Sequence, residues 1–246
     1  MPYLSLDPEK LTEAIDTLER RIGERFPESS LRKVCKDLLG ISQTTKRHTE
    51  WVSSPIVGLR LAVYLLIGLI AAGILTTIGS LDMPGKGVDL IDFVQVLESG
   101  INDVVLISAA VFFLITLEAR IKRGRALKYI HELRSIAHVI DMHQLTKDPE
   151  RMFLKGKNTA SSPKRKKLSP FELGRYLDYC SEMLALTSKL AALHVQDYDD
   201  SVALASVNEV ENLTGGLSQK IWQKLMVLHT IQADLEASEM VEQGSA

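Results

Sequence analysis

The stretch from Leu61 to Leu81, LAVYLLIGLIAAGILTTIGSL, decides the fold class of this chain of 246 residues. Its 21 residues include no charged side chain and no proline. A helix crosses the hydrocarbon core of a bilayer with about 20 apolar residues, and it satisfies its backbone polar groups within its own segment. A buried core helix of a soluble protein is the competing interpretation, but the stretch has no polar face. The sequence therefore predicts a membrane-spanning helix over 61–81.

A second apolar run extends from Val104 to Leu117, with 14 uncharged residues. Extended to 99–119 it reaches 21 residues, with Asp103 and Glu118 close to its two ends. Both carboxylates can lie near a membrane interface or face a cavity lined by protein. We therefore expect a second span over 99–119. Because the mean hydropathy of the whole chain is close to zero, the remainder is expected to be water-soluble.

The basic residues predict the orientation of the two spans. They collect before the first span and after the second, whereas the intervening loop over 82–103 contains Lys86 as its one basic residue. Cytoplasmic flanks of membrane spans are rich in Lys and Arg. We therefore expect a multi-pass protein of the inner or plasma membrane, with both termini cytoplasmic and the acidic loop outside.

The rest of the chain predicts helices throughout. Asp7-Pro8 and Ser169-Pro170 are typical helix starts, and apolar residues recur at helical spacing after each of them. Gly215-Gly216 predicts a break between a helix over 199–214 and a last helix from Leu217 onward. The predicted fold is all-α: an oligomeric integral membrane protein with two transmembrane helices and cytoplasmic helical bundles. Its expected parts are an N-terminal helical hairpin over 1–54, the two-span region over 55–121, an extension of the second span over 122–150, a basic linker over 151–169 and an acidic three-helix bundle over 170–246.

No pattern in the sequence predicts catalysis. Nucleotide-binding loops, hydrolase elbows and zinc-protease motifs are absent from the sequence. Cys35 and Cys180 are too few and too far apart for a disulfide framework, and we expect reduced core thiols. His131 and His138 lie two helical turns apart, too far to hold one ion together. We expect no enzyme, no cofactor and no metal site.

The most informative constellation is an acidic helix face that leads into the second span. If residues 88–103 are helical, Asp89, Asp92 and Asp103 share one face, because their spacing follows the helical repeat. Continued through the membrane, this face consists of apolar residues and then a carboxylate. The candidate ion pathway is Asp89, Asp92, Asp103, Ile107, Leu114 and Glu118. In an oligomer, such a face would form a vestibule that attracts cations above an apolar constriction.

An alternative explains the same carboxylates without a pore. The helix over 88–103 could lie flat on the outer leaflet, with its carboxylates in water. Asp103 would then cap the N-terminus of the second span, where the helix dipole favours an anion. Both interpretations are compatible with the sequence.

The basic run Lys164, Arg165, Lys166 and Lys167 is the second candidate site. Such a run could bind anionic lipid headgroups, nucleic acid or another anionic ligand. A solvated charge run is the alternative, and a latch contact with the acidic C-terminal bundle is a third. The run has no interleaved aromatic residue and lies in a linker, which argues against sequence-specific binding of nucleic acid.

The sequence thus predicts two functions of different classes. The first is an oligomeric two-span channel or pore that favours cations and is assembled or gated through its cytoplasmic helices. Its partners would be the lipid bilayer and further copies of the chain. The second is a non-conducting anchor or scaffold that holds a cytoplasmic partner protein. The layout is similar in plan to small two-span pore proteins, including toxic membrane effectors of bacteria, but it contains no family motif.

Overall fold

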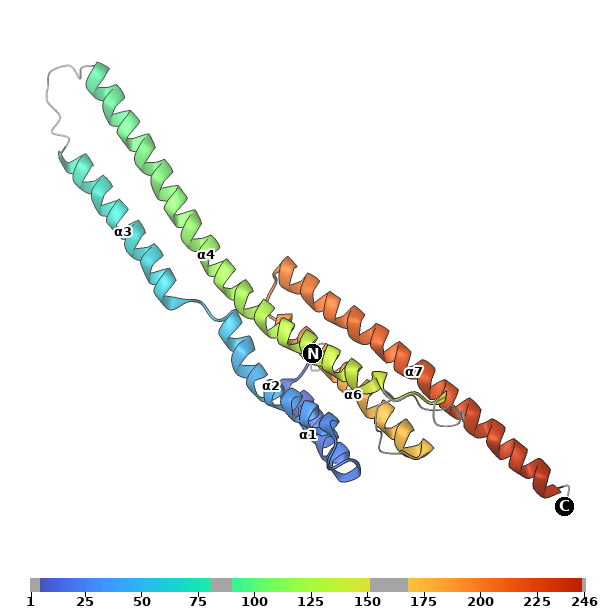
Figure 1. Ribbon diagram of the computed structural model, residues 1–246. Helices are drawn as coiled ribbons and strands as arrows, with labels where there is room; N and C mark the ends of the chain where they lie inside the picture. The colour runs from blue at the N-terminus through green and yellow to red at the C-terminus, as the bar shows by residue number, and fades with distance from the viewer. Residues whose placement is uncertain (1–4, 81–89, 151–167, 245–246) are drawn as a thin grey trace, which may run out of the picture. The chain divides into compact units, whose positions relative to one another are not determined.

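The computed structural model describes residues 5–80, 90–150 and 168–244. Within these ranges all regular elements are helices, so the predicted all-α fold is confirmed. The helices are α1 (Pro8–Arg25), α2 (Ser30–Ser53), α3 (Val57–Ser80), α4 (Leu90–Leu145), α6 (Pro170–Val195) and α7 (Ser201–Gly244) (Figure 1).

The chain divides into two compact units. The bundle unit joins Met1–Val52 with Ala126–Ala246, and the apolar unit comprises Ser53–Arg125. The N-terminal helices, the end of α4 and the C-terminal helices therefore form one body, although the sequence suggested separate domains. A helix with a single apolar stripe is stable only when that stripe is buried against other helices, and these segments provide the cover for one another.

A local signal sets the start of α1 as expected. The side chain of Asp7 accepts hydrogen bonds from the backbone N–H groups of Glu9 (2.9 Å) and Lys10 (3.4 Å). These bonds satisfy backbone donors that have no partner inside the helix. The buried positions of α1 are Leu11, Ile15, Leu18 and Ile22, and those at the start of α2 are Leu31, Val34, Cys35 and Leu38.

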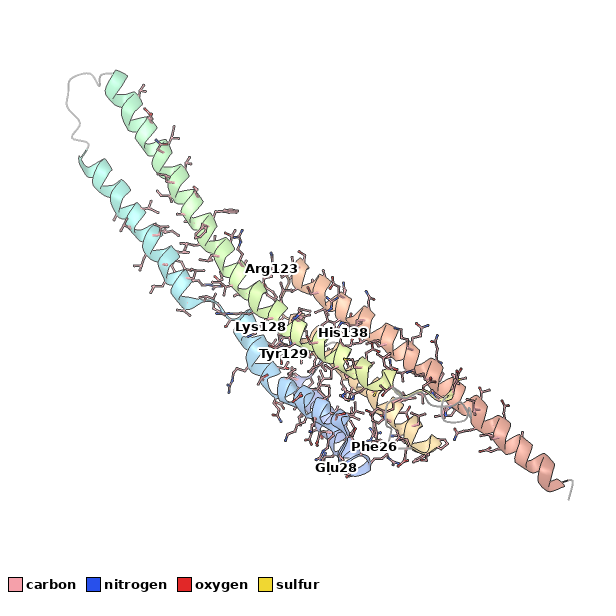
Figure 2. All side chains as sticks on the ribbon, viewed as in Figure 1. Phe26, Glu28, Arg123, Lys128, Tyr129 and His138 are labelled. Atoms are coloured by element: carbon pink, nitrogen blue, oxygen red, sulfur yellow. The ribbon has the colours of Figure 1, made fainter. Side chains whose placement is uncertain are left out.

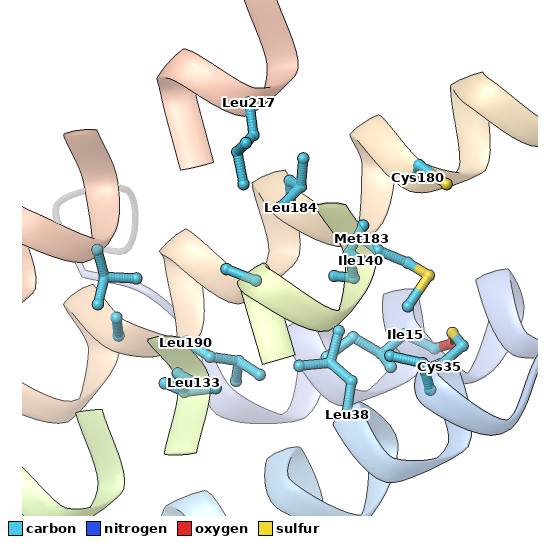
Figure 3. Packing of buried hydrophobic residues seen from close by; sticks show 14 of the residues in the cluster. Ile15, Cys35, Leu38, Leu133, Ile140, Cys180, Met183, Leu184, Leu190 and Leu217 are labelled. Carbon is cyan, nitrogen blue, oxygen red and sulfur yellow. Dashed lines mark hydrogen bonds between the residues drawn. The ribbon is translucent and has the colours of Figure 1, made fainter. Parts of the chain in front are cut away.

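The last part of α4 crosses the core of the bundle unit. Its heptad seam is buried: Ile130, Leu133, Ala137 and Ile140. Figure 3 shows Leu133 and Ile140 among side chains from α1, α2 and α6, including Leu38 and Met183. The seam therefore packs on helices of the same chain. The helix ends at Leu145, within the extension expected over 122–150.

The C-terminal part contains two described helices where the sequence suggested three. α6 begins at the predicted start with a capping box: Ser169 Oγ accepts from Glu172 N (3.2 Å), and Ser169 N donates to the Glu172 carboxylate (2.7 Å). The expected break at Gly215-Gly216 is wrong, because α7 continues through both glycines. Thr214, Leu217 and Ile221 on the two sides of the pair are buried, and their burial offsets the helix cost of glycine, about 1 kcal/mol per residue.

The apolar unit contains α3 and the first part of α4. Of the described residues, α4 provides one helix that is long and apolar enough to cross a membrane, and none of its most apolar window is buried. A shorter apolar helix covers Val57–Gly73 within α3. Large apolar side chains in this unit are open, for example Leu69 (75% exposed) and Phe112 (70% exposed).

Candidate functional site

Between residues 56 and 118, the half-buried positions of the apolar unit follow one stripe on each helix, apart from Thr116. On α4 the stripe consists of Ile107, Ala110, Val111, Leu114, Leu117 and Glu118. The stripe on the other side consists of Ile56, which directly precedes α3, and then Leu59, Val63, Leu66 and Ile70. Positions three and four residues apart share a helix face. We infer that these two stripes are the faces that α3 and α4 turn toward each other.

Glu118 joins the two helices at one end of these stripes. Its Oε1 lies 3.0 Å from Lys122 Nζ and accepts from the backbone N–H of Ile56 at 3.4 Å. Its Oε2 lies 3.8 Å from Arg60 Nε in the first turn of α3. The side chains of Glu118 and Lys122 are 17% and 13% exposed. We call this group of Glu118, Lys122, Arg60 and Ile56 N the charge clamp, and in it one carboxylate pairs with two cations.

The charge clamp contains Glu118, which is one of the predicted ion-pathway residues. Ile107 and Leu114 lie on the same α4 stripe as Glu118 and are half-buried. Asp92 and Asp103 belong to α4, but their side chains lie outside the described part of the structure. Asp89 and the basic run over 164–167 also lie outside the described residues. In a single chain, the described part of the predicted pathway is thus partly covered.

The hydroxyl of Tyr129 is a buried polar group of the bundle unit that the sequence did not predict. Tyr129 extends from the part of α4 that belongs to this unit (Figure 2). Its hydroxyl donates to the carbonyl oxygen of Ile41 at 2.5 Å and lies 2.8 Å from Thr45 Oγ1. Burial raises the pKa of Tyr129 above its usual value. No sequence pattern singled out Tyr129, and nothing in the sequence predicted its partners on α2.

A second cluster surrounds Tyr179 at the contact between α1 and α6. The guanidinium carbons of Arg21 and Arg175 lie 5.3 Å and 5.0 Å from the centre of its ring. A cavity of about 460 Å³ adjoins them, and its lining includes three arginines, the residue type that binds anions. Arg21 pairs with Glu182 at 2.7 Å, however, and Arg175 pairs with an aspartate at 3.0 Å. The Arg21–Glu182 pair joins α1 to α6, whereas the pair of Arg175 lies within α6, and both reduce the net positive charge at the cavity.

The two cysteines are buried in the bundle core. Burial is the main cause that raises the pKa of Cys35 and of Cys180 to about 12. A thiol with such a pKa stays protonated at neutral pH and is a poor nucleophile. Among the described residues, no three side chains of His, Cys, Asp or Glu lie close enough together to hold a metal ion.

No protein-family model, curated protein or solved structure matches this chain. The charge clamp, the exposed apolar helices and the packed bundle are therefore the features from which a function is inferred.

Proposed function

We propose that this chain is a non-enzymatic membrane anchor. Two spans, in α3 and α4, would hold the bundle unit at the cytoplasmic face of the cell membrane, where it binds a partner protein. The charge clamp carries this proposal, because it neutralises Glu118 at the base of two helices that are otherwise apolar and open. An unpaired carboxylate is costly in hydrocarbon, whereas a paired one at the interface fastens two spans together.

The dimensions of the helices support two crossings. At about 1.5 Å per residue, the 24 residues of α3 extend about 36 Å, and a bilayer core is about 30 Å thick. Apolar residues cover all sides of α3, which is typical of a helix in contact with lipid. The 56 residues of α4 are more than sufficient for a span followed by a soluble segment.

The clamp also supports the expected orientation. It joins Arg60, at the start of α3, to Glu118 and Lys122, at the end of the apolar part of α4. The basic ends of both helices therefore meet at one interface, as they do when two spans form a hairpin. The remaining cations of this end are Arg120, Arg123 and Arg125. Such an excess of basic residues is typical of the cytoplasmic side.

Cysteine labelling tests the two crossings and their orientation. Cys35 and Cys180 are fully buried, so they should give little background with a maleimide that cannot cross membranes. Lys86→Cys, in the predicted outer loop, should be labelled in intact cells. Gln219→Cys, on the exposed side of α7, should be labelled only after the membrane is opened. In intact cells, labelling of both sites or of Gln219→Cys alone would contradict the proposal.

An oligomeric channel that favours cations is the second candidate. One observation favours it: Asp103 lies within α4 at helical spacing from Ile107 and Leu114, next to the most apolar part of that helix. Several copies around an axis could shelter such carboxylates as a ring, and a ring of acids attracts cations. The bundle units would then assemble the oligomer or bias its open and closed states.

Recordings from planar bilayers separate the two candidates. Purified full-length protein, with its oligomeric state determined in parallel, should give electrically silent bilayers if it is an anchor. Cation currents that fall with Asp103→Asn would instead support the channel. Glu98→Gln is the matched control, because it removes a carboxylate of α4 from another helix face. Currents that respond equally to both substitutions would not support an ion pathway along the Asp103 face.

A further inference from the structure

Arg60 presents the exposed charge of the charge clamp. Its side chain is 56% exposed, and it meets Glu118 through Nε at 3.8 Å. Lys122 lies closer to the same carboxylate, at 3.0 Å, and its side chain is 13% exposed. Because the clamp joins two cations to one carboxylate, it has a net positive charge. Lys122 pairs with Glu118 at short range, so Arg60 is the cation that faces outward with this excess charge.

The guanidinium of Arg60 has donors for a further acceptor. An arginine side chain presents several N–H donors in a rigid planar fork, and the pair with Glu118 is made at Nε. Within the part of the chain that the structure describes, Glu118 is the one carboxylate paired with Arg60. The terminal nitrogens of such a fork match two oxygens of a phosphate group. Arg60 can therefore bind a phosphate while it keeps its contact with Glu118.

An exposed apolar flank leads from Arg60 along α3. Tyr64, Ile67 and Ala71 follow Arg60 at helical spacing, and all of these side chains are exposed. Tyr64 and Ile67 are 69% and 47% exposed. The flank borders the α3 stripe that turns toward α4. A hydrocarbon chain can lie along this flank below a phosphate that is held at Arg60.

The length of the flank matches one leaflet of a bilayer. Ala71 follows Arg60 by 11 residues, which is about 16 Å along a helix. Half of the hydrocarbon core of a bilayer is about 15 Å thick. Residues 61–81 contain no charged side chain, so Arg60 marks the polar end of this flank. In the proposed anchor, that end lies at the cytoplasmic interface, where the headgroup phosphates of one leaflet lie.

We propose that Arg60 and the flank of Tyr64, Ile67 and Ala71 form a binding site for one anionic phospholipid. The terminal guanidinium nitrogens donate to the headgroup phosphate, and an acyl chain lies along the flank. The excess positive charge of the clamp favours a headgroup with a net negative charge over a zwitterionic one. This inference rests on the proposed anchor function, because a lipid headgroup reaches Arg60 only where α3 enters the membrane.

Lipid titration followed by native mass spectrometry tests the site in the full chain in a neutral detergent. The wild type should bind one phosphatidylglycerol more tightly than phosphatidylcholine. Arg60→Gln should weaken binding of phosphatidylglycerol by about tenfold, because it removes charged donors to the phosphate. Arg60→Lys should weaken it less, since an ammonium keeps the charge but lacks the fork. Arg120→Gln is the matched control. Arg120 is exposed on a face of α4 other than that of Glu118, so its loss should leave binding unchanged.

Glu118→Gln separates lipid binding from the integrity of the charge clamp. This change breaks the clamp, as Arg60→Gln does, but it raises the net positive charge of the group. The variant should therefore bind phosphatidylglycerol at least as tightly as the wild type. Equal weakening by Glu118→Gln and Arg60→Gln would overturn the proposal, because both would then act by loosening the apolar unit.

Two further comparisons identify the ligand. Equal affinity for phosphatidylcholine and phosphatidylglycerol would overturn the proposal. So would displacement of phosphatidylglycerol by inorganic phosphate at equal concentration, which indicates a site for a free anion.

The cysteine labelling described above distinguishes a failure of the lipid site from a failure of the anchor. If Lys86→Cys and Gln219→Cys are labelled as expected and Arg60→Gln binds phosphatidylglycerol like the wild type, the lipid site alone is wrong. Labelling that contradicts the two crossings overturns the anchor and the lipid site together.

Discussion

The ring of Tyr129 in α4 is stacked on the imidazole of His194 in α6, with ring centroids 3.6 Å apart and ring planes at 12°. The hydroxyl of the same tyrosine reaches α2, where it bonds Ile41 O and Thr45 Oγ1. One side chain therefore connects three helices of the bundle unit. Tyr129 lies 88 residues after Ile41 and 65 residues before His194, so these contacts exist only in the folded bundle.

Tyr129→Phe should destabilise the bundle while it keeps the ring contact. The change removes the hydroxyl and its hydrogen bond to Ile41 O, which still accepts from the hydroxyls of Thr44 and Thr45. The loss of one intramolecular hydrogen bond costs about 0.5–1.5 kcal/mol. Thermal unfolding of the full chain in detergent measures the loss. Tyr64→Phe is the control, because Tyr64 is exposed on α3 and its substitution should change stability by less than about 0.5 kcal/mol. Equal stability of both variants would show that the hydroxyl contacts are unimportant.

Two neighbouring residues of α4 should differ sharply in their effect on stability. Ile140 is fully buried, whereas Val139 is 40% exposed. Ile140→Ala leaves a cavity and should cost about 2–5 kcal/mol, whereas Val139→Ala should cost clearly less. Denaturant unfolding of the two variants checks this. Similar losses for both would contradict the orientation of α4 in the bundle.

Acid should weaken the bundle unit through His143. Burial and then the nearby charge of Lys147 lower the pKa of His143 below its usual 6.5. The unfolded chain therefore takes up a proton near pH 6.5 that the folded chain does not, and unfolding is favoured as the pH falls. The contribution of this group to stability is complete above pH 6.5 and declines as the pH falls from there toward the lowered pKa.

His143→Asn should reduce this pH dependence. Unfolding temperatures between pH 7.5 and pH 5.5 compare the variant with the wild type, in which His143 Nδ1 lies 3.4 Å from Ser30 Oγ. His138→Asn, at an exposed position of α4, should retain the full dependence. A wild-type bundle equally stable at both pH values would contradict the prediction.

Breaking the charge clamp should loosen the apolar unit. Glu118→Gln removes the charge that holds Lys122 and Arg60, and we expect a cost of about 1 kcal/mol, the upper end for partly exposed ion pairs. Lys122→Gln should cost less, since Arg60 still balances the carboxylate. Unfolding in detergent, followed by a fluorophore attached near α3, measures both. Greater damage from Lys122→Gln would show that Glu118 is not the centre of the clamp.

The helix starts and the buried faces followed from the sequence. Asp7-Pro8 and the Ser169–Glu172 capping box act within one turn of chain, so their residue types suffice to predict them. Burial of the seam from Ile130 to Ile140 is equally predictable, because a helix places residues at heptad spacing on one face. The apolar character of α3 and α4 likewise depends only on composition.

Tertiary structure decided what those faces touch. No local signal pairs Glu118 with Arg60, which lies 58 residues earlier, because their contact depends on how α3 and α4 meet. Gly215-Gly216 reads as a break by propensity, yet α7 passes through it, since burial of Thr214 and Leu217 on the two sides outweighs that preference. Helix caps and hydrophobic periodicity depend on residues close in the sequence, so they form in any tertiary context. The pairing of distant side chains depends instead on the free energy of burial in the assembled bundle. The same free energy decides whether a helix continues through residues of low helix propensity.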